Sequence, residues 1–186
     1  MPQMSYRLLS MITLGFAISL SIFVVELKNH GIYAANYPHE AALNGQNEVS
    51  QTNSTATGLL EIRMLDDNST LRYRLNVTGI SDASGVQIYS GKTGENGPVL
   101  VNLLQPGKSK HADTTYGMII RGNITDSSLQ GPVQGKTLGD LISLMNSGDT
   151  YVNILTLNHP DGEIRGQIQN TEGTNSTSIG ISTLTE

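Results

Sequence analysis

Hydrophobic and polar residues alternate along several short stretches that follow an apolar N-terminal segment. The clearest is LRYRLNVT, residues 71–78, in which Leu71, Tyr73, Leu75 and Val77 fall on one side and polar residues fall on the other. A period of two is the side-chain period of a β-strand. Residues 71–78 are therefore predicted to form a half-buried antiparallel strand.

The stretch just before it follows the same period. TGLLEIRML, residues 57–65, places Leu60, Ile62 and Met64 on one side, with charged residues between them. The residues DDNS (66–69) between the two stretches favour a turn, because Asp and Asn side chains readily close one. We expect the two strands to pair as a hairpin.

One stretch changes to a helical period. In TLGDLISLMNSG, residues 137–148, Thr137 is a suitable N-cap, Asp140 stands three residues later and Gly148 follows the end. These features predict one short helix of about ten residues. Its apolar face consists of Leu138, Leu141, Ile142 and Met145.

A second hairpin is predicted near the C-terminus. YVNILTL (151–157) and EIRGQIQ (163–169) flank NHPDG (158–162), and Pro-Asp-Gly is a strong turn signal. In the second strand Ile164 and Ile168 should face inward. The outward positions are Glu163, Arg165 and Gln167. With the other alternating stretches, the chain has about eight short strands, which indicates an all-β antiparallel sandwich or barrel.

The N-terminal segment predicts export. Leu8–Val25 is an uncharged run of 18 residues preceded by Arg7 and is predicted to be a hydrophobic helix, so residues 1–35 are predicted to be either a cleaved signal peptide or a retained membrane anchor. Either way the remainder should be extracytoplasmic, secreted or held at the outer face of the membrane. Residues 170–186 are polar and are predicted to be a disordered tail.

Composition narrows the classes of function. The net charge is −5 and the nearest approach to a basic cluster is Lys108 with Lys110, so nucleic-acid binding is not expected. There is no cysteine, which excludes disulfides, thiolate metal sites and a cysteine nucleophile.

Asn-linked glycosylation is compatible with export. Five Asn-x-Ser/Thr sequons are candidate sites, and the hairpin prediction places the second and third on exposed positions. They are Asn53, Asn68, Asn76, Asn123 and Asn175.

Catalytic signals are absent from the sequence. His159, Asp161 and Glu163 lie close together, but strand geometry directs Glu163 away from the turn, so an exposed turn is favoured over a metal site. GKTGENG, residues 91–97, lacks the spacing of a phosphate-binding loop and is predicted to be a flexible loop. Glu163 and Arg165 share one strand face and are expected to form cross-strand charge pairs. No catalytic, cofactor-binding or metal-binding residue is predicted.

Four blocks resemble a known family, in order along the chain. They are LNGQNEV (43–49), GVQIYSGKTGENGPVLVNL (85–103), KTLGDLISLMNSGDTYVNILT (136–156) and HPDGEIRGQI (159–168). Together they resemble the chordin-type (CHRD) domain over about residues 39–169, and the domain is assigned to residues 36–169. The resemblance implies an immunoglobulin-like β-sandwich of about eight strands and an extracytoplasmic location.

The chain departs from the family at three positions. Many microbial members carry a His-x-His pair where this chain has Gln87 and Tyr89, and often a later histidine where it has Leu155. Imidazoles at such positions could hold copper or zinc. Gln, Tyr and Leu do not replace them well, so metal chemistry is not expected here.

The sequence therefore supports a non-catalytic module that binds a protein or glycan at the cell surface, without a cofactor. Its candidate recognition loops contain Lys92, Glu95, Asn96, His159 and Asp161. The alternatives are a metal-dependent enzyme of the superoxide-dismutase sandwich type, supported only by fold analogy, and a passive structural component of the envelope. The membrane is a partner only if the leader is retained.

Overall fold

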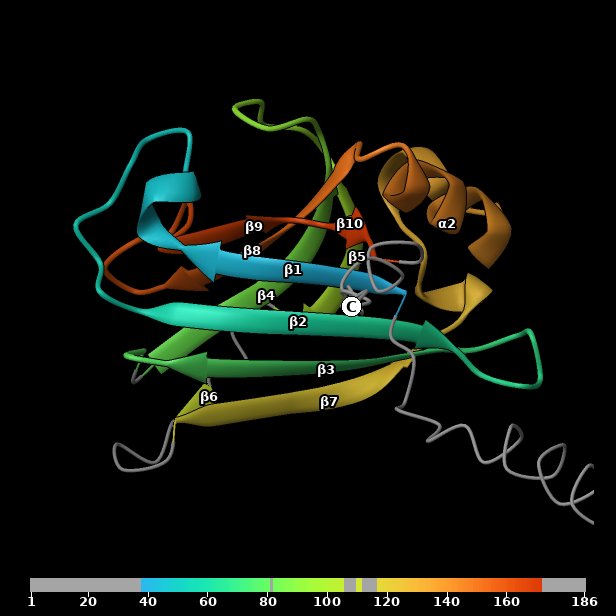
Figure 1. Ribbon diagram of the computed structural model, residues 1–186, viewed down its shortest axis with the longest axis horizontal. Coiled ribbons are helices and arrows are strands. Elements are labelled where there is room, and N and C mark those ends of the chain that lie inside the picture. Colours follow the sequence, from blue (N-terminus) through green and yellow to red (C-terminus); the bar gives the residue numbers. More distant parts are fainter. Residues whose placement is uncertain (1–37, 81, 106–109, 112–116, 172–186) are drawn as a thin grey trace, which may run out of the picture. The chain divides into compact units, whose positions relative to one another are not determined.

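The computed structural model describes most of the chain beyond the predicted leader (Figure 1). The described residues are 38–80, 82–105, 110–111 and 117–171. Residues 1–35, Asn175 and the polar tail beyond Thr171 lie outside them, so the predictions made there are unchanged. Within the described part, no helix is long and apolar enough to span a membrane.

Ten strands and one α-helix make up the described fold. The strands are β1 (His39–Asn44), β2 (Thr57–Met64), β3 (Leu71–Thr78), β4 (Asp82–Ser90), β5 (Val99–Leu104), β6 (Lys110–His111), β7 (Met118–Ile124), β8 (Thr150–Thr156), β9 (Ile164–Gln167) and β10 (Gln169–Asn170). The helix is α2 (Leu138–Asn146), and the 3₁₀ turns are η1 (Gly45–Asn47), η2 (Asp126–Ser128) and η3 (Gly131–Val133).

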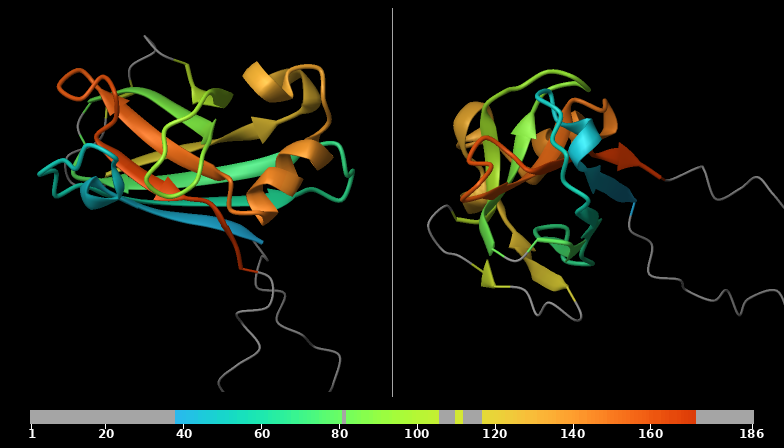
Figure 2. Two further views of the ribbon diagram at one scale, coloured as in Figure 1. Left: turned by 90° about the horizontal axis from the view of Figure 1, so that it is seen from above. Right: turned by 90° about the vertical axis from the view of Figure 1, so that its left-hand side faces the viewer.

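All strand pairs are antiparallel and belong to one continuous sheet in the order β5-β4-β8-β9-β1-β2-β3-β7. Figure 1 shows β1, β2, β3 and β7 side by side, with β4 and β8 crossing behind them, and Figure 2 shows the same two layers from the side. The short strand β9 joins the layers, because it pairs with β8 and, through Arg165 opposite Asn44, with β1.

The sheet curls until its two edges approach each other. The Tyr73 hydroxyl on β3 donates a hydrogen bond of 2.9 Å to the backbone oxygen of Leu103 on β5. An all-β antiparallel fold with about eight main strands and one short helix is thus confirmed. The sandwich prediction is corrected in one respect: the two layers are halves of a single, nearly barrel-shaped sheet rather than separate sheets.

The interior is built from the predicted inward positions. Each main strand contributes alternate apolar side chains, and α2 adds Leu138, Leu141 and Met145. The largest fully buried apolar residues are Leu43, Leu60, Ile62, Leu71, Leu75, Ile88, Leu100, Ile124, Leu141, Met145 and Ile154. Burial of this apolar surface is the main stabilising contribution.

The helix begins where the sequence predicts. Thr137 is the N-cap, and its backbone N–H donates to Asp140 Oδ2 at 2.9 Å within a capping box. The hydroxyl of Thr137 also donates to the same oxygen, at 2.8 Å. These bonds lower the pKa of Asp140, because they favour the charged carboxylate.

The two ends of the described fold lie together. β10 pairs with the start of β1, His39 opposite Asn170, and the backbone N–H of Thr171 donates to the Pro38 oxygen at 2.7 Å. Asn170, which the sequence assigns to the polar tail, is therefore part of the sheet.

Candidate functional site

A row of polar residues crosses the outward face of β4, β8 and β9. Gln87, Asn153 and Arg165 lie opposite one another in register, and we call these three residues the polar row. Their neighbours along each strand point into the core, so the row lies on the outer side of the sheet. All three are nevertheless buried, and Arg165 is only 1% exposed.

Arg165 is buried because a loop closes over it. Its guanidinium donates to the backbone oxygens of Lys92 and Glu95, at 2.9 and 2.8 Å, and to Asn96 Oδ1 at 3.1 Å. The guanidinium carbon lies 3.4 Å from the centroid of the Tyr151 ring, a cation–π contact. Arg165 therefore binds the loop of residues 91–97 (loop 91–97) to the sheet.

Two predictions made from the sequence are wrong at this position. Loop 91–97 was expected to be flexible, but Arg165 holds it, and Gln167 Nε2 donates to the Gly91 oxygen at 2.9 Å. The expected charge pairs of Glu163 and Arg165 are also not formed. Glu163 instead accepts hydrogen bonds of 2.8 and 2.7 Å from the hydroxyls of Ser54 and Thr156. The alternation of polar and apolar residues along a strand predicts which side of the sheet a residue faces. It does not predict which loop covers that side.

The stacked tyrosines continue the site along β4 and β8. Tyr89 and Tyr151 are paired in register, with ring centroids 5.0 Å apart and an interplanar angle of 6°. The Tyr89 hydroxyl donates to Gln87 Oε1. Burial raises the pKa of Tyr89 to about 12, and the nearby Tyr151, Glu48 and Asp161 add to the rise. Tyr89 is therefore a neutral hydrogen-bond donor at physiological pH.

Glu48 is a buried carboxyl group beside the polar row. It follows η1, is 8% exposed, and its Oε2 accepts from Asn153 Nδ2 at 3.3 Å. Burial raises the pKa of Glu48 to about 7, against the opposing effects of the Arg165 charge and the Asn153 hydrogen bond. Near neutral pH the group is therefore divided between acid and carboxylate.

Two oxygens at this position have no donor. Glu48 Oε1 and Asn153 Oδ1 are both buried without a hydrogen-bond partner. Both lie against Gly162, where an added Cβ would be 2.7 Å from Glu48 Oε1 and 2.6 Å from Asn153 Oδ1. A proton on Glu48 Oε1 would supply a donor to this pair of acceptors, which agrees with the raised pKa.

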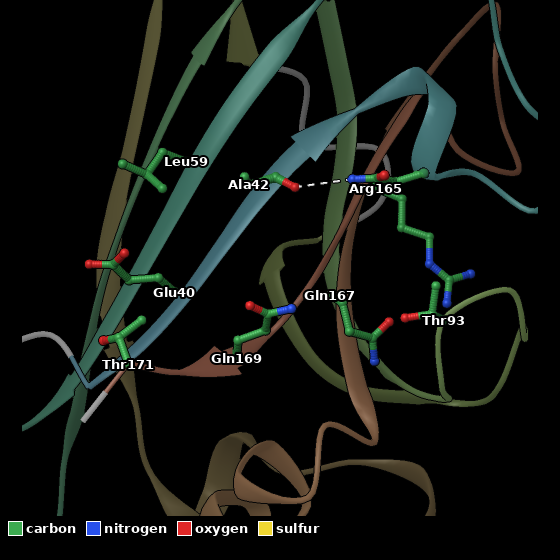
Figure 3. A pocket seen from close by; sticks show the side chains of 9 residues that line it. Glu40, Ala42, Leu59, Thr93, Arg165, Gln167, Gln169 and Thr171 are labelled. Carbon is green, nitrogen blue, oxygen red and sulfur yellow. Dashed lines mark hydrogen bonds between the residues drawn. The ribbon is translucent and has the colours of Figure 1, made fainter. Parts of the chain in front are cut away.

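A polar groove of about 440 Å³ lies beside loop 91–97 (Figure 3). Thr93, Gln167 and the stem of Arg165 lie on one side in the view, and Glu40 and Leu59 lie on the other. The full lining is Glu40, Ala42, Asn47, Leu59, Thr93, Arg165, Gln167, Gln169 and Thr171. Amide, hydroxyl and carboxylate groups of this kind donate and accept hydrogen bonds to a polar ligand.

The structure brings both predicted recognition loops to the polar row. Lys92, Glu95 and Asn96 surround the Arg165 guanidinium, while the backbone oxygen of Asp161 accepts from Asn153 Nδ2 at 3.4 Å. His159 closes the β8–β9 turn, because its backbone oxygen accepts from Thr156 N and Gly162 N. That turn and loop 91–97 leave opposite ends of the strands.

Several residues of the site were not predicted from the sequence. Glu48, Thr93, Tyr151 and Asn153 were not singled out, although Asn153 interrupts an apolar strand, which is a usable signal. The sequence around Glu48 contains no such signal, because the burial of Glu48 depends on how η1 folds against β9.

The positions of the family's histidines also lie on this outward face. Gln87 is opposite Asn153, Tyr89 is opposite Tyr151, and Leu155 is opposite Gly85. Among the residues that the structure describes, no three His, Asp or Glu side chains are grouped as a metal ion would require.

The candidate glycosylation sites remain predictions. Asn53, Asn68 and Asn123 are exposed, whereas Asn76 is half-buried rather than exposed as expected. Asn68 occupies the predicted turn with a φ of +51°, a left-handed conformation that Asn tolerates.

Comparison with known proteins agrees with the resemblance. Curated proteins give no match to the chain. Residues 39–168 match the CHRD domain, a span that runs from the first residue of β1 to the end of the β8–β9 hairpin and includes η1, loop 91–97 and α2. The match to this domain suggests a non-enzymatic binding module and no more specific function. The chain belongs to the CHRD-domain family.

Proposed function

We propose that this chain is an extracytoplasmic, non-catalytic binding module whose ligand site is the groove beside loop 91–97. One observation carries the proposal. The Arg165 guanidinium makes three hydrogen bonds to loop 91–97 and so fixes Thr93 as one wall of the groove. A loop held in place before binding loses little conformational entropy when a ligand arrives.

The lining favours a glycan over an apolar peptide anchor. Gln169 and Thr171 present an amide and a hydroxyl, Glu40 presents a carboxylate, and Leu59 is the large apolar side chain among them. Hydroxyl-rich ligands satisfy such groups by direct and water-mediated hydrogen bonds. The extracytoplasmic location rests on the leader predicted at Leu8–Val25.

The test is a glycan screen together with pull-down from cell-surface fractions, using the full chain at micromolar concentration. We expect a specific glycan to bind, and Thr93→Ala and Gln169→Ala to weaken it at least five-fold. Gln134→Ala, at an exposed glutamine that follows η3, is the matched control and should bind as the parent does. A ligand that binds equally to all four proteins would rule out the groove. An empty screen and an empty pull-down would reject the binding function.

A further inference from the structure

Four of the six arginines gather on one exposed sheet face. Arg63 on β2, Arg72 and Arg74 on β3, and Arg121 on β7 all point to the outer side of the sheet. We call these four residues the arginine surface. Figure 1 shows the three strands side by side, and the polar row lies on other strands of the sheet.

The arginines face one another directly. Arg63 lies opposite Arg72, and Arg74 lies opposite Arg121. Like charges directly across a strand pair are destabilising. A negatively charged protein that places exposed arginines such as Arg72 and Arg121 opposite other arginines concentrates positive charge on this face, which suggests that the charge serves binding.

A carboxylate already occupies part of this surface. Arg74 donates from Nε to Glu61 Oε2 at 2.6 Å and from Nη2 to Glu61 Oε1 at 2.9 Å. The two parallel bonds are the bidentate geometry that a guanidinium makes with a carboxylate. Arg121, which lies opposite Arg74, is exposed, and so is Arg72.

The surface is hollowed between the arginines. A depression of about 490 Å³ is lined by Arg72, Tyr73, Arg74, Arg121, Gly122 and Asn123. Neighbouring strands are about 4.8 Å apart. An extended chain lying across β2, β3 and β7 would therefore meet an arginine on two of the three strands, either Arg63 and Arg72 or Arg74 and Arg121.

We propose that the arginine surface binds an acidic polysaccharide through its carboxylate groups. The surface presents guanidinium forks around a depression, and Glu61 shows the mode of pairing. Nucleic acid fits less well, because its dense phosphates call for many cationic contacts and the protein carries a net charge of −5. A lipid surface also fits less well, because Leu59 and Ile119, the exposed apolar residues of this face, are separated by Asn76 in register.

Two sequon asparagines share this face, and Asn123 lines the depression. The binding assay therefore uses the full chain produced without Asn-linked glycans. The probe is polygalacturonate, measured by isothermal titration at low ionic strength, with double-stranded DNA and anionic phosphatidylserine vesicles as comparisons.

Arg121→Gln should weaken polygalacturonate binding at least five-fold, and Arg72→Gln with Arg121→Gln at least twenty-fold. Lys136→Gln removes the same single charge from an exposed position outside this surface and should change binding less than two-fold. The variants should melt no lower than the parent, so a loss of binding is not a loss of fold.

The proposal would be overturned by an absence of polygalacturonate binding at millimolar galacturonate, by an equal loss in Lys136→Gln, or by tighter binding to DNA or to the vesicles. Thr93→Ala and Gln169→Ala should leave polygalacturonate binding unchanged. A loss in those variants would assign the polysaccharide to the groove and would also overturn this proposal.

Discussion

The outward faces of β4–β8–β9 and of β2–β3–β7 follow the same alternation of polar and apolar residues, yet their charged groups have different surroundings. Arg165 on the first face is closed over by loop 91–97 and makes three hydrogen bonds to it. Arg72 and Arg121 on the second face are exposed. A polar residue on an outward strand position is therefore structural where a loop crosses it, and available for binding where none does.

The largest expected effect is the loss of the covered arginine. Arg165→Ala removes three hydrogen bonds and the contact with Tyr151, and it takes the Arg165 donors from the Glu95 oxygen and from Asn96 Oδ1. We expect the free energy of unfolding to fall by about 3–5 kcal/mol. Urea denaturation measures it, and Arg72→Ala, the exposed counterpart, should change stability by less than about 0.5 kcal/mol. Equal effects would show that coverage does not distinguish the two faces.

The next effect tests how tightly the covered face is packed. Gly162 has a φ of +134°, and an added Cβ would contact the Asn153 amide and Glu48 Oε1. Gly162→Ala should destabilise the protein by about 2–4 kcal/mol, from backbone strain and from displacement of the buried pair. Gly135 has a φ of +76° with nothing within 4 Å of an added Cβ. Gly135→Ala should therefore cost only about 1 kcal/mol, and similar melting temperatures for the two variants would contradict this packing.

The covered face should also make stability depend on pH. The pKa of Glu48 is about 7 in the folded protein, above its ordinary value of 4.5. Its contribution to stability is thus fully present below pH 4.5 and is lost as the pH rises through 7. The groups that face it are Arg165, Asn153 and Tyr89.

Glu48→Gln keeps the neutral form at every pH, so it should flatten the decline of the melting temperature between pH 4.5 and 7. The parent should lose about 1–3 kcal/mol over this range relative to the variant. Parallel melting curves for the two proteins would show that Glu48 is charged throughout.

The smallest expected effect lies on the open face and has the opposite sign. Arg121→Gln relieves the repulsion between Arg121 and Arg74, so the free energy of unfolding should rise by up to about 0.5 kcal/mol. Thermal melting at low salt measures it, and added salt should reduce the gain because it screens surface charges. A clear loss of stability would mean that the arginine surface is structural.

Local features were predictable from the sequence where they depend on neighbouring residues. The helix begins directly after its N-cap Thr137 because Thr137 and Asp140 have the spacing of three residues that a capping box needs. The inward positions of β3 follow from its period of two. The CHRD resemblance placed the domain in its family. The continuous sheet was not predictable, because it depends on the short pairing of Arg165 with Asn44.

The arginine surface and the site around Arg165 and Glu48 differ in how far they could be predicted from residues close together in the sequence. Arg63 and Arg72 belong to one predicted hairpin, so their closeness was visible in the sequence, but Arg121 joins them only because β7 pairs with β3. The absence of a basic cluster in the sequence was therefore a poor guide to the folded surface. The burial of Arg165 and Glu48 depends on which loops cross β9, which no local pattern encodes.

The pairing of β10 with β1 also has a mechanical consequence. Since Pro38 and Thr171 are hydrogen-bonded, a pulling force applied at these two points acts across the β1–β10 ladder and opens its bonds one after another. The domain should therefore yield at low force when stretched between these ends. For the same reason it can be inserted into a surface loop of another protein, or circularly permuted with a short linker, without separating the host's chain ends.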